Sequence, residues 1–120
     1  MKRIHQPGGS YENESRCSLV ERGEYLVNAA ACDGCHSPKV FTPEGPVLDA
    51  SRRLSGHPAD ERLPDLPRGL FSPDGWGALT NNGLTVAYGP WGVSFASNLT
   101  PHETGLGPWT ETFFIQTMRT

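Results

Sequence analysis

The chain has 120 residues, which suits a single domain built around one hydrophobic core. Its formal net charge is −3 and its ten Lys and Arg residues are scattered, so it lacks the basic surface typical of nucleic-acid-binding proteins. No apolar run approaches the roughly 20 residues that cross a bilayer, and residues 1–16 lack the apolar stretch of a secretory signal.

The N-terminal part of the chain is polar up to residue 17. Because such a segment buries too little apolar surface to offset its ordering entropy, we expect residues 1–17 to form a flexible arm. A helix is predicted over residues 18–31, since Leu19 and Leu26 recur on one face and Ser18 is suited to cap the first turn.

The middle of the chain, residues 38–108, keeps neither a helical nor an alternating apolar period for long. Turn-forming combinations such as "EGP", "NNG" and "YGP" recur every few residues, which favours loops over helix or sheet. A loop of this length is abnormal in a compact domain unless it surrounds a bound object. Helical spacing returns in "WTETFFIQTM", with Thr110 as the candidate N-cap, and this second helix is predicted to run to the chain end.

Two cysteines and a histidine lie within five residues, in the order Cys32, Cys35, His36. A Cys-x-x-Cys-His run is the attachment signature of c-type haem, in which both thiols become thioethers on porphyrin vinyl groups. Thiols at i and i+3 of a helical turn reach neighbouring vinyl groups, and the next residue brings an imidazole to the iron as an axial ligand. The pattern predicts one covalently attached haem c, and the long loop then has an object to surround.

Two other uses of a thiol pair compete with haem attachment. A structural zinc site needs four ligands, usually two such pairs, whereas this chain adds Cys17, His57 and His102 at irregular distances. A thioredoxin-type dithiol needs a βαβ setting, and no apolar β run precedes Cys32. A small zinc-binding module remains the alternative without haem, and Cys17 is assigned no role.

Three stretches of the sequence resemble one family: "ERGEYLVNAAACDGCHSP", "RRLSGHP" and "GPWGVSFASNLTPHETGLGPWTETFFIQTMRT". They resemble the periplasmic c-type cytochromes of bacteria, in particular the cytochrome subunits of membrane-bound alcohol and sugar-acid dehydrogenases. The resemblance covers residues 20–120. It implies a mainly α, cytochrome c-like domain over residues 18–120, with a long Gly/Pro-rich loop region between two helices.

The resemblance assigns Cys32 and Cys35 as thioether anchors and His36 as the axial ligand of the haem iron. The family's sixth ligand is usually a methionine in a proline-rich loop beyond the point where this sequence stops, so we expect the C-terminal part of the domain to be missing. Met118 is the candidate sixth ligand, although a methionine on a helix more often fills core space. His57 is a further candidate, by bis-histidine ligation.

Aromatic residues supply much of the large apolar area after residue 70, and their expected role is to form the core: Trp76, Tyr88, Trp91, Phe95, Trp109, Phe113 and Phe114. An alternative is that Trp91, Phe95 and Trp109 line the haem edge, exclude water and raise the reduction potential of the iron. Asn98 and Arg53 are candidate donors to the haem propionates.

The predicted function is covalent haem c binding and one-electron transfer in a bacterial periplasmic respiratory chain, without catalysis on a substrate. Its predicted partners are redox proteins, namely a dehydrogenase, an oxidase or another cytochrome. The periplasmic location comes from the resemblance, because c-type haem is attached outside the cytoplasm. If the sixth position stays open, the alternative is a five-coordinate haem protein that binds small ligands or peroxide, with His57 or His102 as the acid–base group.

Overall fold

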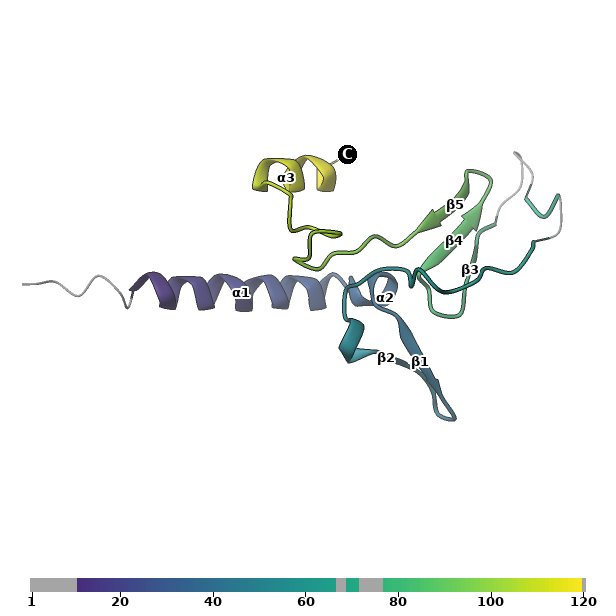
Figure 1. The fold of residues 1–120 in the computed structure, drawn as a ribbon, viewed down its shortest axis with the longest axis horizontal. Coiled ribbons are helices and arrows are strands. Elements are labelled where there is room, and N and C mark those ends of the chain that lie inside the picture. The colour runs from purple at the N-terminus through teal and green to yellow at the C-terminus, as the bar shows by residue number, and fades with distance from the viewer. Residues whose placement is uncertain (1–10, 67–68, 72–76, 120) are drawn as a thin grey trace, which may run out of the picture. The chain divides into compact units, whose positions relative to one another are not determined.

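The structure is a computed structural model, and it describes residues 11–66, 69–71 and 77–119 (Figure 1). The chain divides into two units, Met1–Ala31 and Cys32–Thr120, and each is described by itself. The predicted arm falls largely on residues 1–10, which lie outside the described residues.

In the described part of the first unit, residues 11–31, the chain forms the helix α1, which spans Tyr11–Ala29. The predicted start at Ser18 is wrong by seven residues, so the expected boundary between arm and domain falls inside this helix. The segment before Ser18 is rich in glutamate, which favours helix without any apolar periodicity to reveal it. The helix ends before Ala31, which has a φ of 55° in the left-handed region typical of a helix C-terminus.

The second unit begins with the short helix α2, Asp33–His36, followed by the hairpin of β1, Lys39–Thr42, and β2, Gly45–Leu48. A two-residue turn joins the strands, and Gly45 after it has a φ of 126°, which a residue with a side chain adopts only under strain. The amide of Asp49 donates to the carbonyl of Pro38 at 2.9 Å and closes the base of the hairpin. The 3-10 helix η1, Ala50–Arg52, comes next.

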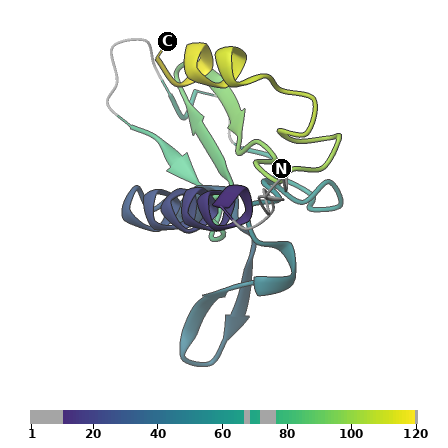
Figure 2. The same ribbon diagram turned by 90° about the vertical axis from the view of Figure 1, so that its left-hand side faces the viewer.

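A three-stranded antiparallel sheet follows, in the order β3, β4, β5, with bounds Leu79–Thr80, Val86–Gly89 and Gly92–Phe95. Figure 2 shows these three strands side by side, with the β1–β2 hairpin projecting away from them. The turn before β4 is organised by the Asn81 side chain, whose Oδ1 accepts from the amides of Thr85 and Val86 at 2.8 and 3.0 Å.

The last element is α3, Glu111–Arg119, which confirms the predicted second helix. The Oγ1 of Thr110 accepts a hydrogen bond from the amide of Phe113 at 3.2 Å, as expected of an N-cap. The indole of Trp109 packs edge-on against the ring of Phe113, with centroids 4.7 Å apart. This contact fixes the direction in which the chain enters the helix.

The buried core of the described residues is small. Val86 and Tyr88, both on β4, are its buried hydrophobic residues, and Ser37 and Thr85 are buried polar residues. Several large apolar side chains of the second unit are instead about half exposed: Phe41, Val93, Phe95, Phe113 and Phe114. The expectation that the aromatic residues form an ordinary core therefore holds for Tyr88, and it is wrong for four exposed residues: Trp91, Phe95, Phe113 and Phe114.

The fold class predicted from the sequence is wrong, because the chain is not mainly α. Five strands in two antiparallel sheets occupy the stretch that was expected to be a long loop, and α1 and α3 are the longer helices among the described residues. The strands escaped prediction because each has at most four residues, too few for an alternating pattern to stand out. Within the described part of the chain, no helix has the length and apolar content needed to cross a membrane.

Candidate cofactor-attachment site

The motif Cys32–His36 folds as one helical turn at the start of the second unit. Cys32 has helical dihedral angles, and its carbonyl accepts from the amides of Cys35 and His36 at 3.3 and 2.9 Å. Side chains three residues apart on such a turn lie on the same face, so both sulfurs are presented together. Both thiols are free; Cys32 is half-buried and Cys35 is exposed. The structure therefore brings together the three residues that the sequence singled out.

The imidazole of His36 is held by the backbone of a distant segment. Its Nδ1 lies 2.8 Å from the carbonyl oxygen of Ser97. A carbonyl oxygen only accepts, so Nδ1 carries the proton and donates it. The neutral ring then has its lone pair on Nε2, which has no hydrogen-bond partner among the described residues. Histidines that ligate metals commonly donate their other ring N–H to a carbonyl or carboxylate in this way.

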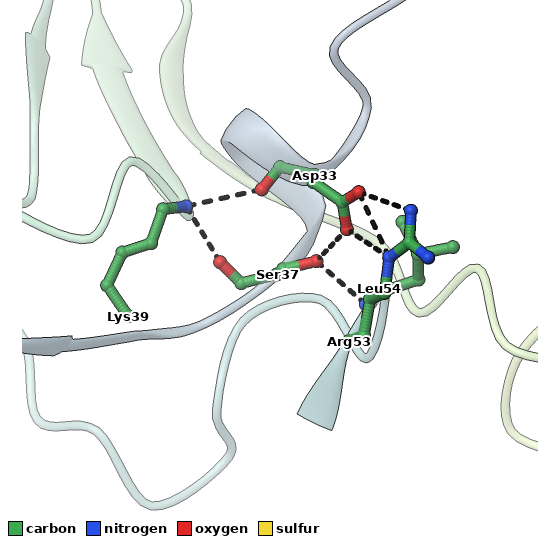
Figure 3. Close-up of polar contacts among 5 residues, drawn as sticks. All are labelled: Asp33, Ser37, Lys39, Arg53 and Leu54. Carbon is green, nitrogen blue, oxygen red and sulfur yellow. Dashed lines mark hydrogen bonds and ion pairs between the residues drawn. The ribbon is translucent and has the colours of Figure 1, made fainter. Parts of the chain in front are cut away.

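Asp33, inside the motif, joins the helical turn to a segment twenty residues later (Figure 3). The Nε of Arg53 lies 3.1 Å from each carboxylate oxygen, and its Nη2 lies 2.8 Å from Oδ2. The hydroxyl of Ser37 donates to Oδ1 at 2.6 Å. The hydrogen bond from Arg53, with that from Ser37 and the nearby positive charges, holds the pKa of Asp33 below its ordinary value of 3.8 although burial opposes this shift.

Lys39 ties the first strand to the end of the motif turn. Its Nζ donates to the carbonyls of Gly34 and Ser37 at 2.6 and 2.7 Å and lies 3.3 Å from that of Asp33. It also donates to the carbonyl of Gly83 at 3.0 Å, in the turn before β4. Carbonyls at the end of a helical turn lack intrahelical donors, and an ammonium group satisfies them while complementing the helix dipole.

The loop at Gly56 brings the Ser97 carbonyl to the motif. The amide of Gly56 donates to the carbonyl of His36 at 2.8 Å. A Cβ added to Gly56, whose φ is 77°, would lie 2.5 Å from the Ala96 oxygen and 2.7 Å from the Ser97 oxygen. Only glycine allows the two backbones to approach this closely while keeping that φ.

The two candidate sixth ligands, Met118 and His57, and the candidate acid–base group His102 have different surroundings. Met118 on α3 is 71% exposed, so it does not fill core space. The ring of His57 is half-buried, packs against Phe95 with centroids 5.1 Å apart, and has its Nδ1 3.0 Å from the Thr85 hydroxyl. The Nδ1 of His102 lies 2.9 Å from the Thr104 hydroxyl.

The other residues singled out in the sequence, among them those expected to contact a haem, lie at different places in the structure. Trp91 is 62% exposed, and its ring lies over Gly89 of its own hairpin, where a Cβ would overlap it. The Asn98 side chain is engaged by Thr100 and Thr104 within its own loop. Arg53 does lie at the motif, although it contacts Asp33. Trp76 lies outside the described residues, as does the side chain of Cys17.

Two further features bear on alternative ligands. Within residues 11–66, 69–71 and 77–119, no group of three or more His, Cys, Asp or Glu residues is arranged to hold a metal ion. A cavity of about 440 Å³ is lined by residues that include Phe41, Pro58, Pro64 and Asn82, and neither the cysteines nor the histidine of the motif border it.

Sequence reasoning missed the residues that support the motif. Ser97 contributes only its backbone carbonyl, Gly56 contributes the space that its missing side chain leaves, and Lys39 binds carbonyls. None of these roles produces a periodicity or a spacing that can be seen in the sequence. Asp33 stands in the sequence between the two cysteines, but nothing there indicates its partner, and Arg53 was singled out for a different acceptor.

Searches against models of protein families, curated proteins and solved structures found no match to this chain.

Proposed function

We propose that this chain binds one haem c covalently through Cys32 and Cys35, with His36 as an axial ligand, and that it transfers single electrons between redox proteins. The observation that carries the proposal is the hydrogen bond from Nδ1 of His36 to the Ser97 carbonyl at 2.8 Å. With the proton on Nδ1, the lone pair of Nε2 is available on a ring whose sequence position already suits iron ligation.

The thiols suit thioether formation for three reasons. They are free, they lie on one face of a helical turn, and Cys35 is exposed. Each thiol would add across a vinyl C=C bond: the sulfur bonds one carbon, the thiol hydrogen goes to the other, and no leaving group or oxidant is needed. Two such bonds prevent dissociation of the haem, so a single axial histidine from the chain suffices to keep the haem in one orientation.

The group, when bound, supplies an iron that cycles between the ferric and ferrous states. The chain's part is to orient the imidazole, to satisfy the carbonyls of the motif turn through Lys39, and to cover part of the group with apolar side chains. The half-exposed side chains of Phe95 and Phe113 offer such surface. The periplasm and the partners proposed here, a dehydrogenase, an oxidase or another cytochrome, follow from the resemblance to bacterial cytochromes.

Whether the chain supplies a sixth ligand to the iron distinguishes electron transfer from the alternative. The alternative is a five-coordinate haem protein that binds small ligands or peroxide. The exposure of Met118 at 71% favours keeping this alternative, because core packing does not hold that sulfur in a fixed place. His57 and His102 each have Nδ1 beside a threonine hydroxyl, and either could act as ligand or as acid–base group through Nε2.

Absorption spectra in both redox states test the proposal on full-length protein made in cells with a haem-attachment system. We expect a Soret band that stays with the protein on denaturation, and low-spin spectra if a sixth ligand binds. Met118→Ala should change the spectra only if Met118 is that ligand, with Ile115→Ala on the same helix as the control. A high-spin spectrum would support the five-coordinate alternative. Bound zinc without a Soret band would contradict both haem hypotheses and support the zinc-binding module instead.

A further inference from the structure

Residues 53–57, here named the bridging segment, are hydrogen-bonded to the motif on one side. Arg53 makes a two-pronged contact with the Asp33 carboxylate. The amide of Leu54 donates to the Ser37 hydroxyl at 2.8 Å, and the segment's Gly56 amide donates to the His36 carbonyl. Figure 3 shows Arg53 and Leu54 reaching the motif turn from the same side.

The same segment is hydrogen-bonded on its other side to residues 96–99. The carbonyl of Leu54 accepts from the amide of Leu99 at 2.8 Å, and the amide of His57 donates to the carbonyl of Ala96 at 2.9 Å. Between these two bonds lies Ser97, whose carbonyl receives the Nδ1 proton of His36. The bridging segment therefore determines where the Ser97 carbonyl stands relative to the motif.

The ion pair between Arg53 and Asp33 is better placed than an ordinary surface pair to hold this arrangement. The Asp33 side chain is 14% exposed, and that of Arg53 is 37% exposed. Two parallel N–H donors on one carboxylate fix direction as well as distance. The adjacent Arg52 makes a pair with Asp49 that does not reach the motif, with the arginine 48% exposed.

We propose that Arg53 is a positioning residue for His36: its two-pronged contact with Asp33 holds the bridging segment against the motif, and this aims the Nδ1–H of His36 at the Ser97 carbonyl. The role at iron rests on the proposed function, whereas the effect on the imidazole belongs to the polypeptide itself. Loss of the contact would weaken the Nδ1–H hydrogen bond, make the imidazole a less basic ligand and raise the reduction potential of a bound iron.

The first test uses the full chain without cofactor and reads the His36 ring by ¹⁵N NMR under alkaline conditions, where the imidazole is neutral. We expect the Nδ1–H tautomer to predominate in the wild type and in Arg52→Met. In Arg53→Met its population should fall several-fold in favour of Nε2–H. A folded Arg53→Met protein with the wild-type tautomer population would overturn the proposal.

Arg53→Lys provides a second variant, because lysine keeps the charge without the planar fork. The amide signals of Thr85 and Val86, in and beside β4, report whether each variant is folded. If Arg53→Met does not fold, the proposal stands or falls on Arg53→Lys, in which a partial loss of the Nδ1–H tautomer is expected and an unchanged tautomer contradicts it.

The second test measures the reduction potential of the haem-loaded proteins. The potential should rise in Arg53→Met and stay at the wild-type value in Arg52→Met. A wild-type chain that never acquires haem would refute the proposed function and leave the tautomer result intact. A haem-loaded Arg53→Met protein with unchanged potential and tautomer would refute only the positioning role.

Discussion

At the scale of single residues, the candidate site depends on Gly56 as much as on the cysteines. Its φ of 77° and its contact with the Ala96 and Ser97 backbones leave no room for a Cβ. The motif residues were predictable because their chemistry demands their order and spacing. Gly56 was not, because a close approach of two backbones depends on tertiary structure and leaves no local pattern.

Gly56→Ala should destabilise the protein by about 2–4 kcal/mol, the sum of the left-handed φ and the steric overlap. It should also push the Ser97 carbonyl away from His36. Urea denaturation measures the free energy of unfolding. The control is Gly69→Ala, since Gly69 has the same φ of 77° with open space around it. Equal losses in the two variants would mean that the contact at Gly56 adds nothing.

Asp33 should make the stability of the protein sensitive to acid. Its pKa is lower in the folded protein than its ordinary value of 3.8, chiefly because Arg53 donates to it. A carboxylate with a lowered pKa contributes stability that is present above 3.8 and is lost as the pH falls through the folded value. Unfolding free energies of Asp33→Asn should therefore decline less than those of the wild type over this acidic range.

The pKa of Asp49 is also lowered, to about 2, by hydrogen bonds from Ser51 and Arg52. Comparing the unfolding free energies of Asp33→Asn and Asp49→Asn across the acidic range therefore shows how much each carboxylate contributes to the loss of stability. Wild-type and Asp33→Asn curves that run parallel through the acidic range would show that the ion pair with Arg53 does not contribute.

At the scale of elements, α2 is too short to be stable alone, and its neighbours hold it. A four-residue helix gains little from its own hydrogen bonds, so the ammonium of Lys39 on its carbonyls and the Asp33–Arg53 pair maintain the turn. The cap of α3 at Thr110 was predictable because capping is local. The hairpins were not, although the turn signals "EGP" and "YGP", which were interpreted as loop, overlap the two-residue turns that close them.

Lys39→Met should lower the free energy of unfolding by about 1.5–3 kcal/mol, because part-buried carbonyls lose a charged donor. It should also increase hydrogen exchange at the His36 and Ser37 amides, whose bonds form the motif turn. The control is Arg62→Met, which changes an exposed cation that has no hydrogen-bond or ion-pair partner among the described residues. Unchanged exchange in Lys39→Met would contradict the role given to the ammonium.

At the scale of the whole molecule, the described residues bury few apolar side chains, and Val86 and Tyr88 make up their hydrophobic core. The bound object that the loop-rich sequence was expected to surround stays a prediction. Strands in place of loops could not be predicted, because pairing between segments is a tertiary property and runs of four residues are too short to show it.

Attachment of the cofactor should raise the urea midpoint of the full chain, since a covalently held apolar group adds buried area to the folded state. Matched samples with and without haem, made from the same gene, provide the comparison. An identical midpoint in both would show that the cofactor, if attached, does not pack against the fold.

Mass spectrometry of the exported, matured chain tests the central claim most directly. The account predicts an increase by the mass of one haem, mapped by proteolysis to the peptide with Cys32 and Cys35, retained in Cys17→Ala and lost when both motif cysteines are replaced by alanine. The mass of the bare polypeptide, from cells that attach haem to other proteins, would contradict it.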